Sequence, residues 1–339
     1  MSKLLKVFLI ASFAVASFSA KAVTVASWGG AYTESQQKAY ADTYSDPSSI
    51  QFENYNGGLG EVRAQVESGS VTWDLVDVLP SDAITGCDEG LFEDISSEIA
   101  DLSTPGPDGE TMLEDMENNG LEYNSGWDCC VPQIFWTYVV FFDPDAFPGE
   151  KPASMADFFD TEKFPGKRGI HTWATGIIEK AMVADGVKPN AVPTVLEKQT
   201  GALDRAFAKL DTIKDDIVFW SAGSQPLELV KSGEVVMAIA YNGRVGAANL
   251  AEGENFEYIW EGQVLDQEYL CLMTGAPNRD VAVDFMMHAS TPEAQAEQAK
   301  YITYGPMRAS GIPIIQNLSL IHISEPTRRY AISYAVFCL

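Results

Sequence analysis

The sequence predicts an α/β protein of two lobes, each a mainly parallel sheet flanked by helices, joined to one another by two crossing strands. Runs of β-branched and aromatic residues alternate with helical patterns along the chain, which is typical of parallel sheets. The 295 residues from 23 to 317 are enough for two lobes. No low-complexity linker separates the halves, so we expect strands to connect them.

The expected strands are short apolar runs bounded by polar or glycine-containing turns. The longest aromatic run is "QIFWTYVVFFD". The expected strands are Val23–Ser27, Ile50–Asn56, Trp73–Pro80, Gln133–Asp143, Asp216–Ser221, Val235–Arg244 and Glu257–Met273.

Segments with helical character lie between and after these strands. Ser81 follows the third strand and is expected to cap the next helix at its N-terminus. The other expected helices are Tyr32–Ser45, Gly60–Gly69, Thr175–Asp185, Pro193–Gln199, Gly201–Leu210, Gln225–Glu234, Asn278–Ser290 and Thr291–Ile302. We assign residues 23–134 and 265–317 to the first lobe and residues 135–264 to the second.

The first 22 residues have the features of a secretory signal peptide. Lys3 and Lys6 provide a positively charged start, an apolar run extends to Phe18, and residues 20–22 ("AKA") match the small-x-small cleavage pattern. We therefore expect a mature protein that begins at Val23 and resides in the periplasm.

The last 22 residues, 318–339, depart in composition from the acidic body of the chain. Their sequence starts with "LSLIHISEPTR" and is similar to the translation of a transposase-type sequencing adapter. We expect this tail to be non-native.

The formal net charge is −26 for the whole sequence and −30 for residues 23–317, because the leader carries three lysines and the tail two arginines and one glutamate. Phosphate-rich partners need basic patches, so this charge argues against nucleic acid and anionic membranes as partners. It suits a soluble secreted protein and is compatible with a cationic ligand, although solvation of the surface explains most of it.

The cysteines of the body are Cys87, Cys129, Cys130 and Cys271. Their spacing is not that of a metal site, and we expect neither a metal nor a cofactor. An oxidising compartment favours a disulfide. Because adjacent side chains point in different directions, one of Cys129 and Cys130 should pair with Cys87; we predict Cys129, with Cys130 as the alternative.

Aromatic and small polar residues recur where the expected strands end. Ligands of such sheets bind outside the carboxyl ends of strands, so these residues are candidates for a binding cleft, with core packing as the alternative for each ring. They are Trp28, Gly29 and Tyr32; Ser81 and Asp82; Thr172 and Trp173; Trp220, Ser221 and Gln225; and Tyr241 and Asn242.

Enzymatic and nucleotide-binding functions lack their motifs. Residues 223–225 ("GSQ") do not form the G-x-S-x-G of a hydrolase, and His171 and His288 have no clear partner pattern. The glycines of "NGGLG" match neither G-x-G-x-x-G nor a P-loop. We therefore expect a binding protein rather than an enzyme.

Several stretches together resemble a known family. The sequence is similar to the periplasmic spermidine/putrescine-binding proteins of ABC importers, within the type II extracellular solute-binding proteins. The stretches are "SWGGAY", "AQVESGSVTWDLVDVLPSDAITGCDEGLFEDIS", "DFFDTEKFPGKRGI", "SGEVVMAIAYNGR" and "YGP", in an order that covers residues 23–310.

The resemblance implies two lobes that close around one solute and deliver it to a membrane permease; we expect the protein itself to be a monomer. It implies pocket roles for Trp28, Tyr32, Ser81, Tyr241, Asp266, Glu268 and Tyr304. Asp266 stands where the family has an aromatic residue. The acids that the family carries after "RGI" are replaced here by His171, Thr172 and Trp173.

Aromatic faces and carboxylates favour a cation, so we expect a polyamine such as putrescine or spermidine. Arg244 lies beside the strand-end motif at Tyr241. It leaves open a carboxylate-bearing solute, such as an amino acid or a betaine, that would use Arg244 together with the aromatic residues.

Overall fold

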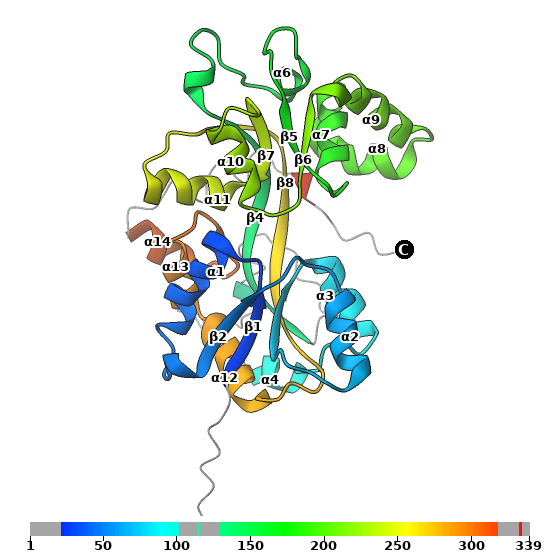
Figure 1. Cartoon of the computed structure of the whole chain (residues 1–339). Coiled ribbons are helices and arrows are strands. Elements are labelled where there is room, and N and C mark those ends of the chain that lie inside the picture. The colour runs from blue at the N-terminus through cyan, green and yellow to red at the C-terminus, as the bar shows by residue number, and fades with distance from the viewer. Residues whose placement is uncertain (1–21, 102–113, 116–128, 318–331, 334–339) are drawn as a thin grey trace, which may run out of the picture.

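The computed structural model describes residues 22–101, 114–115, 129–317 and 332–333 (Figure 1). The expected leader up to residue 21, most of the expected non-native tail and Cys338 lie outside these ranges.

The described strands form one continuous mixed sheet. Its order is β2-β1-β3-β8-β4-β7-β5-β6, with β9 paired to β4 and β10 paired to β8. The strands are β1 Val23–Ser27, β2 Ile50–Asn54, β3 Leu75–Val78, β4 Cys130–Phe142, β5 Arg168–His171, β6 Ile217–Trp220, β7 Met237–Tyr241, β8 Glu257–Leu272, β9 Gly305–Pro306 and β10 Ile332–Ser333.

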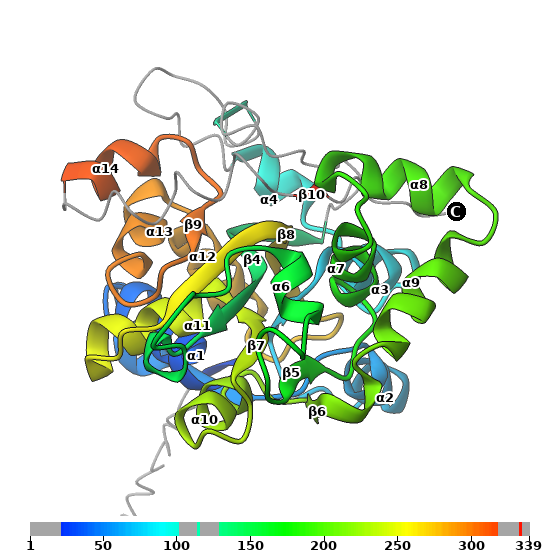
Figure 2. The same cartoon turned by 90° about the horizontal axis from the view of Figure 1, so that it is seen from above.

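Helices cover both faces of this sheet (Figure 2). The α-helices are α1 Gly30–Gln36, α2 Gly60–Ser68, α3 Pro80–Asp88, α4 Ser96–Asp101, α6 Met155–Phe159, α7 Ile177–Ala184, α8 Val192–Lys198, α9 Ala202–Asp211, α10 Gln225–Lys231, α11 Asn242–Ala247, α12 Arg279–Ala289, α13 Pro292–Gln298 and α14 Gly311–Asn317. Short 3-10 or π segments are η1 Gln37–Ala41, η2 Pro47–Ser49, η3 Pro144–Ala146, η4 Pro189–Ala191, η5 Lys214–Asp216 and η6 Ala248–Glu252.

Two lobes divide the sheet between them (Figure 1). In lobe 1, β1 pairs in parallel with β2 and β3; in lobe 2, β5 pairs in parallel with β6 and β7. The long strands β4 and β8 run antiparallel to each other through both lobes. The α/β class with crossing strands is therefore as the sequence predicts, and we propose the lobe boundaries 23–134 with 265–317, and 135–264.

The crossing strands are built from the aromatic run that the sequence singles out. Every residue of β4 is buried, and its pairing with β8 shifts register near Pro132 and near Val139. Since neighbouring strands cover both edges of β4 and helices cover its faces, an apolar run without alternation is what this position requires. The two strands thus belong to both lobes and form the part of the sheet that the lobes share.

Local differences from the expected elements have identifiable causes. Ser81 does not cap α3: Pro80 occupies the first turn, Leu79 is the capping position, and no side chain bonds there. Proline is favoured at this position because it has no backbone N–H to satisfy. The sequence "RGIH" forms β5, a four-residue strand too short to stand out before the polar turn that follows it.

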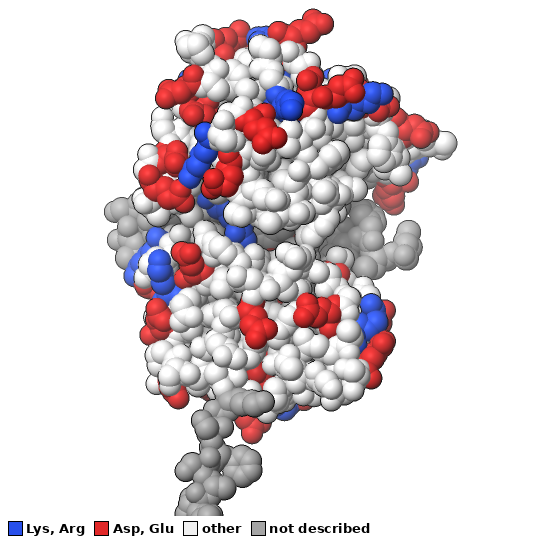
Figure 3. Space-filling model, viewed as in Figure 1, with Lys and Arg blue, Asp and Glu red and all other residues white. Residues whose placement is uncertain are grey.

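Acidic side chains are distributed over the outer surface of both lobes on the face shown in Figure 3. Basic side chains are fewer, and one group of them lies at the waist between the lobes. On this face, the negative charge is thus mainly exposed to solvent, as expected for charge that keeps the surface hydrated.

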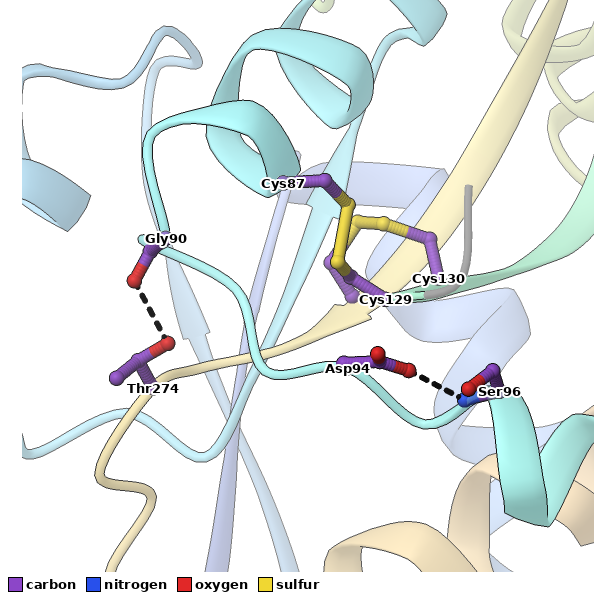
Figure 4. Close-up of a disulfide and its surroundings, with 8 residues drawn as sticks. Cys87, Gly90, Asp94, Ser96, Cys129, Cys130 and Thr274 are labelled. Atoms are coloured by element: carbon purple, nitrogen blue, oxygen red, sulfur yellow. Dashed lines mark hydrogen bonds between the residues drawn. A yellow bond between two sulfur atoms is a disulfide. The ribbon is translucent and has the colours of Figure 1, made fainter. Parts of the chain in front are cut away.

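Two cysteine pairs lie where α3 meets the start of β4 (Figure 4). Cys87 pairs with Cys129, at a Cα separation of 6.0 Å, as the sequence suggested. The second pair, Cys130 with Cys271, was not expected. It follows from the register of β4 on β8, which sets these two residues directly opposite each other.

Candidate ligand-binding site

The chain turns sharply out of β1 at the sequence "SWGGAY". Gly29 and Gly30 have φ values of 72° and 55°, a left-handed conformation that favours glycine. A Cβ on Gly30 would also lie 2.9 Å from the guanidinium of Arg244. The two glycines therefore allow the backbone to turn and to approach lobe 2, while Trp28 and Tyr32 on either side of them face a cavity.

This cavity lies between the two lobes and has a volume of about 80 Å³. Residues of both lobes and of the crossing strands line it. They are Trp28, Tyr32, Tyr55, Asn56, Leu79, Ile134, Trp136, Trp173, Ser221, Ala222, Gly223, Tyr241, Arg244, Glu268 and Tyr304.

The lobe 1 wall consists of aromatic rings that touch one another. The rings of Trp28 and Tyr55 are 5.1 Å apart between centroids, and those of Tyr32 and Tyr304 are 5.9 Å apart. The Tyr32 hydroxyl is buried and has no hydrogen-bond partner in the described structure. A buried hydroxyl without a partner is unfavourable, so this group is available to a ligand.

The lobe 2 wall is a second aromatic group, centred on Tyr241. Its ring lies 5.0 Å from that of Trp136 and 5.9 Å from that of Trp220, and its hydroxyl is 2.9 Å from the Tyr138 hydroxyl, which donates to it. Trp220 packs behind Tyr241, outside the cavity wall. The rings of this group therefore support one another and hold Tyr241 in place.

His171 helps to position Trp173 in the cavity wall. Burial lowers the pKa of His171 to about 4, so the imidazole is neutral at physiological pH. Its Nδ1 accepts a hydrogen bond of 2.8 Å from the backbone N–H of Trp173. Trp173 and Trp28 of the other lobe both lie beside Gly57, where a Cβ would be 2.5 Å from the Trp28 ring and 3.6 Å from the Trp173 ring.

Glu268 supplies a buried carboxylate from the crossing strand β8. Its Oε1 accepts a 2.7 Å hydrogen bond from Nε1 of Trp28. Burial raises the pKa of Glu268 well above its usual value, and the charge of Asp77 raises it further, whereas the bond from Trp28 opposes the rise. A cation in the cavity would stabilise the ionised form of this carboxylate.

Two further acids lie near Glu268 but outside the cavity wall. Burial raises the pKa of Asp77, which is fully buried on β3, to about 7. Burial also raises the pKa of Asp266 to about 7; it sits two residues before Glu268, opposite Trp136 on β4. Both add negative potential to the same end of the cavity.

Arg244 brings a positive charge to the same cavity. It is 6% exposed, and its Nη2 donates to the backbone carbonyl of Trp28 at 3.2 Å. Among the ion pairs between described residues, none includes Arg244. A buried guanidinium without a carboxylate partner is a ready site for an anionic group.

The structure brings about half of the predicted site residues to the cavity wall. Those on the wall are Trp28, Tyr32, Trp173, Ser221, Tyr241, Glu268 and Tyr304; those off it are Gly29, Ser81, Asp82, Thr172, Trp220, Gln225, Asn242 and Asp266.

Two of those off the wall show where such residues lie instead. Ser81 is exposed on α3. Asn242 connects the lobes instead: its Oδ1 accepts from the backbone of Thr137, and its Nδ2 donates to the carbonyl of Thr303.

Sequence reasoning missed residues whose position depends on strand pairing. The register on β8 places Ile134 opposite Glu268, which is on the wall, and Trp136, two residues further along β4, shares the face of Ile134, so both face the cavity. Tyr55 and Asn56 follow β2 directly and could have been found by the same strand-end rule that identified Trp28.

No helix among the described residues is long and apolar enough to cross a membrane. Within the same residues, no group of three or more His, Cys, Asp or Glu side chains could hold a metal ion.

Comparisons with known proteins agree with this architecture. The profile of a family described as bacterial extracellular solute-binding protein matches residues 36–313. A gamma-aminobutyric acid-binding protein of Pseudomonas aeruginosa is 35% identical over 316 residues, which are 92% of this chain and 84% of that protein.

Similar solved structures include the binding protein MotA of A. tumefaciens B6 in complex with glucopine. It has a TM-score of 0.75 and 27% identity, and the match covers 92% of this chain and 93% of that one. The GABA receptor Atu4243 has a TM-score of 0.73 and 29% identity, covering 93% and 91%. A putative spermidine/putrescine transporter structure from Listeria monocytogenes, at 17% identity and a TM-score of 0.67, shares the fold.

Two lobes around an aromatic cavity, crossed by two strands, define a substrate-binding protein of an ABC transporter rather than an enzyme. Such a protein binds a small molecule and delivers it to a membrane permease. Within this class, the chain belongs to the bacterial extracellular solute-binding protein family.

Proposed function

We propose that this protein captures a small zwitterionic ω-amino acid of the γ-aminobutyric acid type for import. Arg244 binds the carboxylate of the solute, and Glu268 binds its ammonium group. The observation that carries the proposal is that a buried guanidinium, which has no acidic partner among the described residues, and a buried carboxylate line one cavity. A ligand with both charges neutralises both groups.

The rest of the wall suits the chain between the two charges. Leu79, Ile134 and Trp136 offer apolar surface for methylene groups, each of which contributes about 0.8 kcal/mol when buried. Tyr32 and Trp28 lie beside the acid end, where an ammonium gains roughly 0.5–2 kcal/mol over an aromatic face.

The size of the cavity supports a small solute. A cavity of about 80 Å³ is well above the roughly 10–15 Å³ that a single water needs, so it has room for several groups of that size. γ-Aminobutyric acid and putrescine are short chains of a few such groups, whereas a sugar-derived opine such as glucopine is larger.

The relatives give independent support. The Pseudomonas aeruginosa relative and the receptor Atu4243 are both named for γ-aminobutyric acid. The similar polyamine transporter, at 17% identity, bears on the fold alone.

A polyamine is the second candidate, favoured by the acidic end of the cavity and its aromatic walls. Glu268, with Asp77 and Asp266 behind it, would bind one ammonium of putrescine or spermidine. The other ammonium would then meet Arg244, and two like charges in a desolvated cavity repel each other. For this reason we place the ω-amino acid first.

The family and the leader-like first 22 residues support a periplasmic location after cleavage before Val23. Mass analysis of secreted protein should find Val23 as the first residue; an intact leader would contradict this location.

Isothermal titration with a panel of solutes tests the function. We expect γ-aminobutyric acid to bind with micromolar or lower Kd. Butyrate lacks the ammonium and propylamine lacks the carboxylate, so each should bind at least about tenfold more weakly, one charge-assisted hydrogen bond being worth roughly 1.5–3 kcal/mol. Putrescine binding more tightly than γ-aminobutyric acid would reject the proposal in favour of the second candidate.

A further inference from the structure

Arg244 belongs to lobe 2 but is enclosed by lobe 1. It follows β7 on α11, yet its Nη2 donates to the carbonyl of Trp28 at the end of β1. A Cβ on Gly30 of lobe 1 would lie 2.9 Å from its Nη1, and one on Gly223 of lobe 2 would lie 2.7 Å from its Nε. The guanidinium is thus held between the lobes, and contact between the lobes is what buries it.

The groups around Arg244 do not neutralise its charge. It contacts a backbone carbonyl, the Tyr241 ring at 6.0 Å and the hydroxyl of Tyr304, whose pKa it lowers against the effect of burial. In the described structure no carboxylate lies within ion-pair distance of it. Burying a charge without a counter-charge is strongly unfavourable, so contact between the lobes is opposed until an anion enters.

We infer that Arg244 determines which solutes allow the lobes to close. A carboxylate-bearing solute is therefore selected over a diamine at the step of lobe closure, and not at the first contact of the solute with either lobe. The inference rests on the proposed function. A diamine bound at Glu268 leaves the guanidinium uncompensated, and the lobes stay apart. A solute with a carboxylate neutralises Arg244, which then donates to the Trp28 carbonyl and holds the lobes together.

This role differs from simple affinity for a carboxylate because it predicts an effect without any ligand. Removing the charge of Arg244 removes the opposition to closure, so the ligand-free variant should be more closed than the ligand-free wild type. The same change should let putrescine close the lobes. A charge that acted only on the ligand would leave the ligand-free lobes as open as those of the wild type, so the ligand-free comparison is the decisive one.

The test is small-angle X-ray scattering on the whole protein, unfolded and refolded to remove bound solute. Arg244→Gln removes the charge and keeps an amide donor for the Trp28 carbonyl; Arg244→Met is a second variant of similar length. Arg205→Met is the matched control, because Arg205 is an arginine of lobe 2 paired with Asp185 on the surface. Circular dichroism verifies the fold of each.

We expect the wild type and Arg205→Met to have a larger radius of gyration when ligand-free, and to contract with γ-aminobutyric acid but not with putrescine. Both Arg244 variants should be smaller without ligand, contract with putrescine and bind putrescine about tenfold or more tightly than the wild type. Equal contraction of the wild type by both solutes, or ligand-free variants as open as the wild type, would overturn the inference. If γ-aminobutyric acid leaves the wild type unchanged, the proposed solute is wrong, whereas the ligand-free comparison still decides the inference.

Discussion

Glu268 is a carboxylate in the cavity wall whose charge depends on its surroundings. Burial and the nearby Asp77 raise its pKa, and Trp28 donates a hydrogen bond to one of its oxygens. Asp266 lies two residues away on the same strand, yet off the wall. These two acids are thus a matched pair for testing which one binds the solute.

Glu268→Gln should weaken binding of γ-aminobutyric acid by roughly 1.5–3 kcal/mol, because it removes a charge-assisted hydrogen bond to the ammonium group. Asp266→Asn should change the affinity much less, since Asp266 acts only through its field. Isothermal titration of both variants measures the difference. Equal losses for the two, with both folds intact, would show that Glu268 has no special role.

Binding should also depend on pH through Glu268. Burial raises the pKa of Glu268 and so favours its protonated form, whereas the ammonium of the solute favours the ionised form; binding should therefore release protons, and affinity should rise with pH over the range in which Glu268 titrates. Titration in two buffers of different ionisation enthalpy measures the released proton. Glu268→Gln should lose most of this pH dependence; an unchanged dependence would assign the proton to Asp77 or another neighbour.

At the scale of elements, β4 and β8 determine which side chains reach the cavity. Their antiparallel register places Ile134 opposite Glu268 and Cys130 opposite Cys271. The cysteine pairs connect α3 to the start of β4 and β4 to β8. They therefore fix the lobe 1 end of both crossing strands.

Peptide mapping without reduction should recover Cys87 linked to Cys129 and Cys130 linked to Cys271. The sequence separations are 42 and 141 residues, so loop closure in the unfolded chain would contribute about 4 and about 5 kcal/mol, respectively. Reduction should lower the melting temperature and leave the affinity of the folded protein largely intact. Free thiols at Cys87, or a Cys87–Cys130 peptide, would refute these pairs.

The elements that the sequence predicts well are those whose signal is local. The apolar run of β4 and the glycine turn after β1 are visible in the residues themselves, so the strand, the turn and the cavity position of Trp28 follow from them. Trp136 could not be placed in the same way, because the register of β4 on β8 decides which of its side chains face the cavity.

The identity of the ligand could not be predicted from the sequence for the same reason, because it depends on which side chains the fold brings together. The acids near residue 266 suggested a cation from composition and resemblance, but the chain alone does not show that Asp266 lies off the wall or that Arg244 has no acidic partner among the described residues. Both facts arise from the packing of lobe 2 against lobe 1.

At the scale of the whole molecule, the charge of the outer surface does not determine the charge of the ligand that the cavity binds. On the face shown in Figure 3, the acidic side chains lie on the outer surfaces of the lobes, whereas the cavity wall combines one guanidinium with one carboxylate. A strongly acidic protein can therefore bind a zwitterion, because desolvated neighbours dominate at short range while exposed charges are screened by salt.

The most direct test of the account is the coupling between Arg244 and the carboxylate of the solute. Isothermal titration of wild type and Arg244→Gln with γ-aminobutyric acid and with propylamine forms a double-mutant cycle. We predict that losing the carboxylate costs the wild type about 1.5–3 kcal/mol of binding free energy and costs the variant close to nothing. An equal loss in both proteins would mean that Arg244 does not bind the carboxylate, and would contradict the account.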